Sequence, residues 1–109
     1  MAQIVTIRRG TTPTIRVKQS ADIDFSDIAI LRLTLEQGDI ELTKEVERAD
    51  FTAATYHDFH YTQDETLEFA VGGGKIQCKA KLNDQNVVGG EVGSFKVTEI
   101  LDEDKFEVV

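Results

Sequence analysis

The chain has 109 residues, a formal net charge of −8 and a single cysteine. This length suits one domain with one hydrophobic core, and 40% hydrophobic with 29% charged residues is ordinary for a globular protein. The negative charge argues against a general affinity for nucleic acid, because phosphate repels an acidic surface. One cysteine excludes an intramolecular disulfide, so packing alone must hold the fold together.

The sequence also argues against secretion and membrane insertion. The opening residues MAQIVTIRRG lack a basic segment followed by an apolar one, so we expect no signal peptide. The longest apolar run, IAIL at Ile28–Leu31, is far too short to span a bilayer. A lone cysteine agrees with a reducing cytoplasm.

The first two expected strands are short. Alternating apolar residues predict strands around residues 5–7 and 15–17, joined by RGTTPT. In this connection, Gly10 tolerates a positive φ angle. Pro13 fixes its own φ and donates no backbone hydrogen bond, which places it at the start or the edge of a strand.

A hairpin is the clearest feature of the next part of the chain. The segment ILRLTLEQ alternates apolar and polar residues, and after a tight turn at Gly38-Asp39 the alternation continues. The inward-facing residues of the two strands are predicted to be Leu31, Leu33, Leu35, Ile40, Leu42 and Val46.

The segment Thr55–Tyr61 predicts a fifth strand with Phe59 and Tyr61 on its inner face. One short helix is expected after it, in TQDETLEF. Thr62 is followed three residues later by Glu65, which is the pattern of a capping box. We expect one or two helical turns before VGGG ends them.

The glycines Gly72–Gly74 are expected to reverse the chain into a strand at Lys75–Leu82, whose apolar face would carry Ile76, Cys78, Ala80 and Leu82. Near the C-terminus Phe95 and Val97 alternate, and Ile100 is out of register. A bulge or strand end around Thr98 would explain this slip. The last expected pairing is a short one around Phe106 and Val108.

About seven short strands and one small helix predict an all-β domain over residues 1–109. Strands at such spacing need a second layer to cover their apolar faces, which favours an antiparallel two-sheet sandwich of immunoglobulin-like type. A small barrel is the alternative.

A search for catalytic or metal-binding groups finds no converging set, so we expect no enzyme and no cofactor. His57 and His60 are three residues apart on an expected strand, so they point to opposite faces and do not form a metal site. The segment GGGK lacks the remaining positions of a phosphate-binding loop. Cys78 lies in the apolar register of its strand and is expected in the core.

The carboxylates also give no site. The pairs Asp22/Asp24 and Asp102/Asp104 show no sign of a cleft between two acids. The segment DIDFSD is better explained as a loop than as a calcium site. The eight aromatic residues are scattered and include no tryptophan, so no sugar-stacking row is evident.

Four segments occur in an informative order: IRRGTTPTIRV, SDIAILRLTLEQGDIELTKE, TQDETLEF and GGKIQCKAKLNDQNVVGGEVGSFKVTEIL. This series resembles small prophage-encoded β-sandwich proteins of Gram-positive bacteria. It is similar to the N-terminal domain of siphophage baseplate upper proteins, which docks onto the tail baseplate. The similarity spans nearly the whole chain and brings no catalytic motif.

The resemblance implies a non-enzymatic structural protein of a phage tail or baseplate, which would be made in a bacterial cytoplasm and then carried in the virion. Its partners would be other tail or baseplate proteins, and further copies of the chain in a symmetric ring. The predicted contact residues are Arg9, Thr11, Thr12 and Pro13, together with the acidic segment Leu101–Val109. The alternative function is a sandwich module that binds carbohydrate or cell wall.

Overall fold

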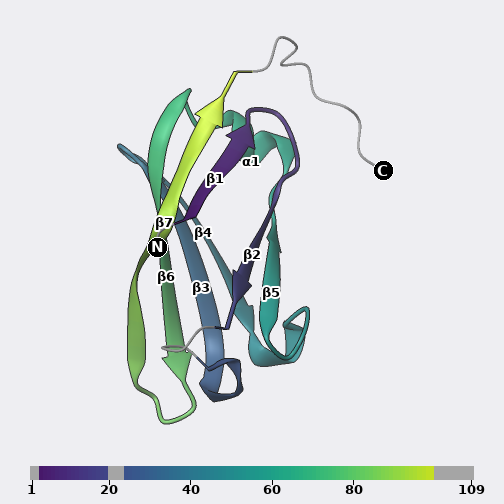
Figure 1. Cartoon of the computed structure of the whole chain (residues 1–109), viewed down its shortest axis with the longest axis vertical. Coiled ribbons are helices and arrows are strands. Elements are labelled where there is room, and N and C mark those ends of the chain that lie inside the picture. Colours follow the sequence, from purple (N-terminus) through teal and green to yellow (C-terminus); the bar gives the residue numbers. More distant parts are fainter. Residues whose placement is uncertain (1–2, 20–23, 100–109) are drawn as a thin grey trace.

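The structure, a computed structural model, describes residues 3–19 and 24–99, which form two β-sheets and one short α-helix. The larger sheet has the strand order β1–β7–β6–β3–β4, and the smaller one pairs β2 with β5. Figure 1 shows the two sheets as facing layers. The strands are β1 (Gln3–Arg8), β2 (Thr14–Lys18), β3 (Ile28–Gln37), β4 (Ile40–Glu47), β5 (Tyr56–His60), β6 (Gly72–Leu82) and β7 (Val87–Thr98). The prediction of an all-β domain is confirmed.

The helical segments are short. α1 (Gln63–Leu67) follows β5, and two 3₁₀ turns, η1 (Phe25–Asp27) and η2 (Arg48–Asp50), flank the β3–β4 hairpin. Figure 1 places α1 at the end of the molecule where β1 and β7 end. Over the described ranges, no helix has the length and apolar character needed to cross a membrane.

The core lies between the two sheets and follows the predicted alternation. Leu31, Leu33 and Leu35 of β3 are fully buried, whereas Arg32 between them is exposed. Each strand thus covers the core with one face and presents the other to water. The other fully or nearly fully buried apolar side chains include Ile7, Phe25, Ile28, Phe69, Phe95 and Val97.

Three local predictions are confirmed. The β3–β4 hairpin turns at Gly38, whose φ of +56° suits glycine. The capping box is present, because Thr62 Oγ1 accepts the Glu65 N–H and the Glu65 carboxylate accepts the Thr62 N–H. Phe59 and Tyr61 are both buried as predicted, although Tyr61 lies just after β5.

The expectation of purely antiparallel pairing is wrong for one pair of strands. β1 runs parallel to β7, from Gln3 opposite Gly93 to Arg8 opposite Thr98, so the larger sheet is mixed. The physical reason lies in the connections. Strands joined by a tight turn must be antiparallel, but β1 and β7 are far apart in the chain, and no short loop fixes their relative direction.

The expected chain reversal at the three glycines is also wrong. Gly72–Gly74 belong to β6, and Gly73 and Gly74 pair with Lys96 and Phe95. A Cβ atom at Gly74 would lie 2.4 Å from the Phe95 ring. Glycine is therefore needed here because an aromatic ring packs directly on the backbone of the neighbouring strand.

The predicted irregularity near Thr98 is a strand end, because β7 stops at that residue. The β6–β7 ladder has its bulge elsewhere, between Ile76, which pairs with Gly93, and Gln77, which pairs with Glu91. The predicted pairing around Phe106 and Val108 lies outside the described residues.

Candidate interaction surface

The loop between β1 and β2, which contains RGTTPT, is bound to α1 by the side chain of Arg9. Its Nε donates to the carbonyl of Phe69 at 2.8 Å, and one terminal nitrogen donates to the carbonyl of Leu67 at 3.0 Å. Carbonyls at the C-terminal end of a helix have no partner within the helix. Arg9 supplies that partner, and so it joins the loop to the end of α1.

Thr66 completes this junction from the helix side. Its Oγ1 accepts the backbone N–H of Gly10 at 3.0 Å and donates to the carbonyl of Thr11 at 2.9 Å. Thr66 is only 1% exposed. Gly10 has a φ of +75° and packs against the side chain of Leu67. We call this set of contacts, from Arg9–Thr11 to Thr66–Phe69, the loop–helix junction.

The four predicted contact residues therefore differ in their surroundings. Arg9, Thr11 and Pro13 are half-buried, and Thr11 Oγ1 donates to the carbonyl of Arg8 at 2.6 Å. The carbonyl of Pro13 accepts the N–H of Tyr61 at 3.1 Å. Thr12 is exposed to solvent, so it is the side chain of this loop most open to a partner.

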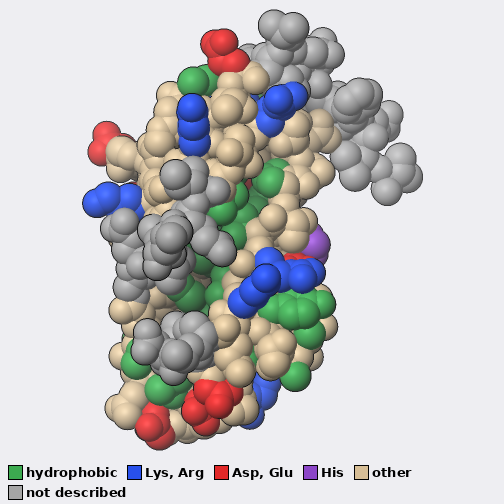
Figure 2. Space-filling view, viewed as in Figure 1, with side chains coloured by type: hydrophobic (Ala, Val, Ile, Leu, Met, Phe, Trp, Pro, Cys, Tyr) green, Lys and Arg blue, Asp and Glu red, His purple; other side chains and the backbone are tan. Residues whose placement is uncertain are grey.

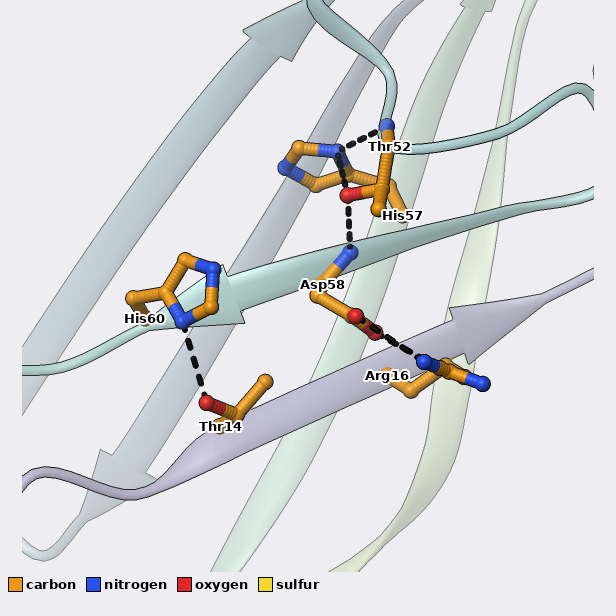
Figure 3. A network of polar contacts seen from close by, with 6 residues as sticks. All are labelled: Thr14, Arg16, Thr52, His57, Asp58 and His60. Carbon is orange, nitrogen blue, oxygen red and sulfur yellow. Dashed lines mark hydrogen bonds and ion pairs between the residues drawn. The ribbon is translucent and has the colours of Figure 1, made fainter.

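The outer face of β2–β5 carries an ordered polar network (Figure 3). Arg16 Nε and a terminal nitrogen donate to the two carboxylate oxygens of Asp58 at 2.7 and 3.1 Å, and the guanidinium lies 4.0 Å from the centre of the Tyr56 ring. The hydrogen bond from Arg16 lowers the pKa of Asp58 below its usual value. Figure 2 shows basic side chains next to apolar surface on this side of the molecule.

The two histidines of β5 do not converge, as predicted. His57 faces inward, with its ring 4.7 Å from that of Phe59 between ring centres, and its Nδ1 accepts the N–H of Thr52 at 3.1 Å. Burial lowers its pKa. His60 is exposed, with its Nδ1 3.0 Å from Thr14 Oγ1. Among the described residues, no three His, Cys, Asp or Glu side chains are grouped to hold a metal ion.

The outer face of the five-stranded sheet has a shallow, largely polar depression of about 500 Å³. Arg32 and Lys79 lie side by side in register at its floor, and Arg32 is paired with Glu45 at 2.7 Å. Val87 of β7, which is 56% exposed, lies at its rim. The depression thus combines the basic groups of Arg32 and Lys79 with the carboxylates of Glu36 and Glu41 and a small apolar surface.

The remaining candidates are structural or lie outside the described residues. Cys78 is buried in the core as predicted, and burial raises the pKa of its thiol to about 11. Asp24 caps η1, because its Oδ1 accepts the N–H of Ser26 at 2.9 Å. Asp22, Asp102 and Asp104 lie outside the described ranges, as does the segment 101–109.

Sequence reasoning missed Thr66 and the Arg16–Asp58 pair. Thr66 stands inside the predicted helix, where a hydroxyl has no obvious purpose unless its distant partner is known. Arg16 and Asp58 lie 42 residues apart. A possible signal was their position, since both flank an inward-facing residue on an expected strand and so face outward.

Comparison with known proteins adds a likeness of fold. No family model and no curated protein matches the chain. A crystal structure of a candidate glycoside hydrolase from Bacteroides vulgatus matches with a TM-score of 0.51 and 15% sequence identity. The match covers 88% of this chain and 16% of that one. At this identity it shows a shared fold of one part of a larger protein and nothing about function.

Proposed function

We propose that the domain is an immunoglobulin-like two-sheet sandwich. In such domains strands C, F and G share one sheet and B and E the other. The order β7–β6–β3–β4 opposite β2–β5 corresponds to G–F–C–C′ opposite B–E. The placement of the E–F connection supports this, since α1 lies between β5 and β6.

We further propose that the protein is a non-enzymatic structural component of a phage or prophage tail or baseplate and acts by protein–protein assembly. The loop–helix junction is the observation that carries this proposal. The segments RGTTPT and TQDETL, which carry the resemblance to baseplate upper proteins, are some fifty residues apart in sequence, yet Arg9 and Gly10 bond directly to Leu67 and Thr66. The two segments therefore form one structural unit, and their resemblance to the baseplate proteins is not two unrelated short similarities.

Purification of phage particles tests the proposal. Prophages of the bacterium that encodes the chain are induced, the particles are separated on a density gradient, and peptides are identified by mass spectrometry. Peptides of this chain that co-migrate with tailed particles, at several copies per particle, are the expected result. Recovery only from the soluble cell fraction would contradict a virion role.

A carbohydrate-binding module is the second candidate. The polar depression over Arg32, Thr34 and Lys79 is the observation in its favour, because its donors and acceptors suit sugar hydroxyls. Specific binding on a glycan array, lost on Arg32→Ala and unaffected by Arg16→Ala on the opposite sheet, would favour this function over assembly.

A further inference from the structure

One edge of the larger sheet is only half covered. β1 pairs with β7 from Gly93 to Thr98, and within the described residues no strand pairs with the outer edge of Val87–Gly90 (Figure 1). The exposed residues on this part of β7 are Val87, Val88 and Gly89, and the two valines are 56% and 38% exposed. An uncharged open strand edge is a ready template for another strand.

The other edge of the same sheet is built differently. β4 alternates exposed Glu41, Thr43, Glu45 and Glu47 with half-buried residues. One of the half-buried residues is Lys44, which points inward. Outward charges and an inward-pointing lysine are two devices that keep an edge strand from pairing with another chain. The first residues of β7 lack both.

The free backbone groups of this edge follow from the hairpin geometry. The N–H of Leu82 donates to the carbonyl of Asn86 at 2.8 Å, so these two residues form a hydrogen-bonded pair. Such pairs alternate in an antiparallel ladder. Val88, opposite Ala80, therefore bonds to β6, and the N–H and C=O groups of Val87 and Gly89 point away from it, toward the open edge.

The neighbouring strand adds charge. On the outer face of β6, Lys79 lies opposite Gly89 and Lys81 opposite Val87. Both lysines are exposed, and within the described part of the chain neither has a hydrogen-bond or ion-pair partner. Lys79 also lies in register with Arg32, an unfavourable placement of like charges. A strand added beside β7 would lie about 10 Å from β6. The side chain of Lys79 on β6 and a carboxylate on the added strand are together long enough to span this distance, and Gly89 between them has no side chain in the way.

The chain itself contains a segment of the matching chemistry. Residues 101–109, LDEDKFEVV, combine four acidic residues with the apolar residues Phe106 and Val108. In the same molecule β7 ends at Thr98, at the opposite end of the strand from Val87–Gly90, and there β1 occupies its outer edge. The corresponding segment of another molecule meets no such obstacle.

We propose that the open edge at Val87–Gly90 binds residues 101–109 of a second copy of this chain as an added strand, with its carboxylates facing Lys79 and Lys81. Each copy then offers one edge and one acidic segment, so the contact is head-to-tail and generates rings or filaments. As an account of assembly in a virion this inference rests on the proposed function. As a contact in solution it is tested with the purified chain alone.

Sedimentation of four samples decides the matter. Val87→Pro removes a free edge N–H and no ladder bond, and deletion of residues 101–109 removes the proposed added strand. The full chain is expected to associate as its concentration rises, and each variant alone to stay monomeric. Their equimolar mixture should form a one-to-one dimer and nothing larger, because one supplies the edge and the other the segment. Circular dichroism confirms that each variant is folded.

Charge reversal provides a second test, which needs neither proline nor deletion. Lys79→Glu should weaken association of the full chain about tenfold, whereas Lys18→Glu, the same charge change on the exposed face of β2, should leave it unchanged. A full chain that stays monomeric to about 1 mM, or association that survives the deletion, would overturn the proposal. If the purified chain is monomeric but its peptides still occur in tailed particles, the proposed edge contact is wrong and the proposed function is still supported.

Discussion

The Nζ atom of Lys44 lies 2.8 Å from Oε2 of Glu65, so the edge strand β4 is tied to the first turn of α1. The same ammonium group lies 5.1 Å from the centre of the Tyr61 ring. Glu65 also belongs to the capping box with Thr62. One carboxylate therefore starts the helix and fixes it to the five-stranded sheet.

Glu65→Gln is predicted to flatten the acid dependence of stability. Burial alone would raise the pKa of Glu65, but hydrogen bonds from Lys44 and the Thr62 backbone lower it overall. A carboxyl with a depressed folded pKa stabilises the protein above its unfolded pKa, and this contribution is lost as the pH falls through the folded value. The variant should lose no more than about 1 kcal/mol at neutral pH and show a shallower decline below about pH 4.5. Urea unfolding at several pH values measures the loss at neutral pH and the decline in acid. If the free energy of unfolding fell equally steeply with pH in the variant and the unmodified protein, the prediction would be wrong.

Thr66→Val tests the loop–helix junction. The substitution keeps the shape of the side chain but removes the hydroxyl that binds the Gly10 N–H and the Thr11 carbonyl. Because two partly buried backbone groups then lack a partner, the free energy of unfolding should fall by about 1–3 kcal/mol. Thr66→Ser, which retains the hydroxyl, is the matched control. Equal losses in the two variants, measured by chemical denaturation, would mean that the missing methyl matters more than the hydrogen bonds.

Gly74→Ala tests the close approach of β6 and β7. The added Cβ would lie 2.4 Å from the Phe95 ring and 2.6 Å from the Glu36 carbonyl, so the ring or the strand must move. We expect a loss of about 1–3 kcal/mol. At the adjacent Gly73 a Cβ meets only the Phe95 carbonyl, at 3.8 Å, so Gly73→Ala should leave the melting temperature nearly unchanged. A reversed order of the two melting temperatures would disprove this packing argument.

Cys78 should react with an alkylating reagent only when the protein unfolds. Burial raises the pKa of its thiol to about 11, from an ordinary value of 9.0, so the reactive thiolate is about a hundredfold scarcer than in the unfolded chain. The rate of iodoacetamide labelling, followed by mass spectrometry, should rise steeply across the urea unfolding transition. Rapid labelling in buffer would show that the thiol is accessible in the native state.

Two substitutions near the N-terminus separate folding from assembly. Ile15→Asp places a charge in the core, where the side chain is 5% exposed, and should cost more than about 3 kcal/mol. Thr12→Asp changes an exposed residue and should leave the unfolding curve intact while it reduces incorporation into phage particles. Normal incorporation of a folded Thr12→Asp protein would show that this loop is not a contact surface.

The features that the sequence could predict are those encoded locally. The alternation of Leu31, Leu33 and Leu35, the turn at Gly38 and the capping box of Thr62 each depend on a few neighbouring residues, and all three are present. Such patterns identify strands, turns and caps without reference to the rest of the molecule.

The features that the sequence could not predict depend on residues that are far apart in the chain. The direction of β1 is set by β7 at the other end of the chain. Gly74 is indistinguishable from a turn glycine until the Phe95 ring is placed against it. For the same reason the sequence gives no sign that the Arg9 guanidinium binds two carbonyls of its own chain, 58 and 60 residues away.

The parallel pairing of β1 with β7 also determines how the domain bears mechanical load. Gln3 begins β1 at one end of this strand pair, and Thr98 ends β7 at the other. A stretching force applied through these two points pulls the strands past each other along their length. The hydrogen bonds between them are then strained together rather than broken one after another, as would occur if two strands of a hairpin were peeled apart from the open end. β1 and β7, the first and last strands that the structure describes, thus form a clamp that resists extension.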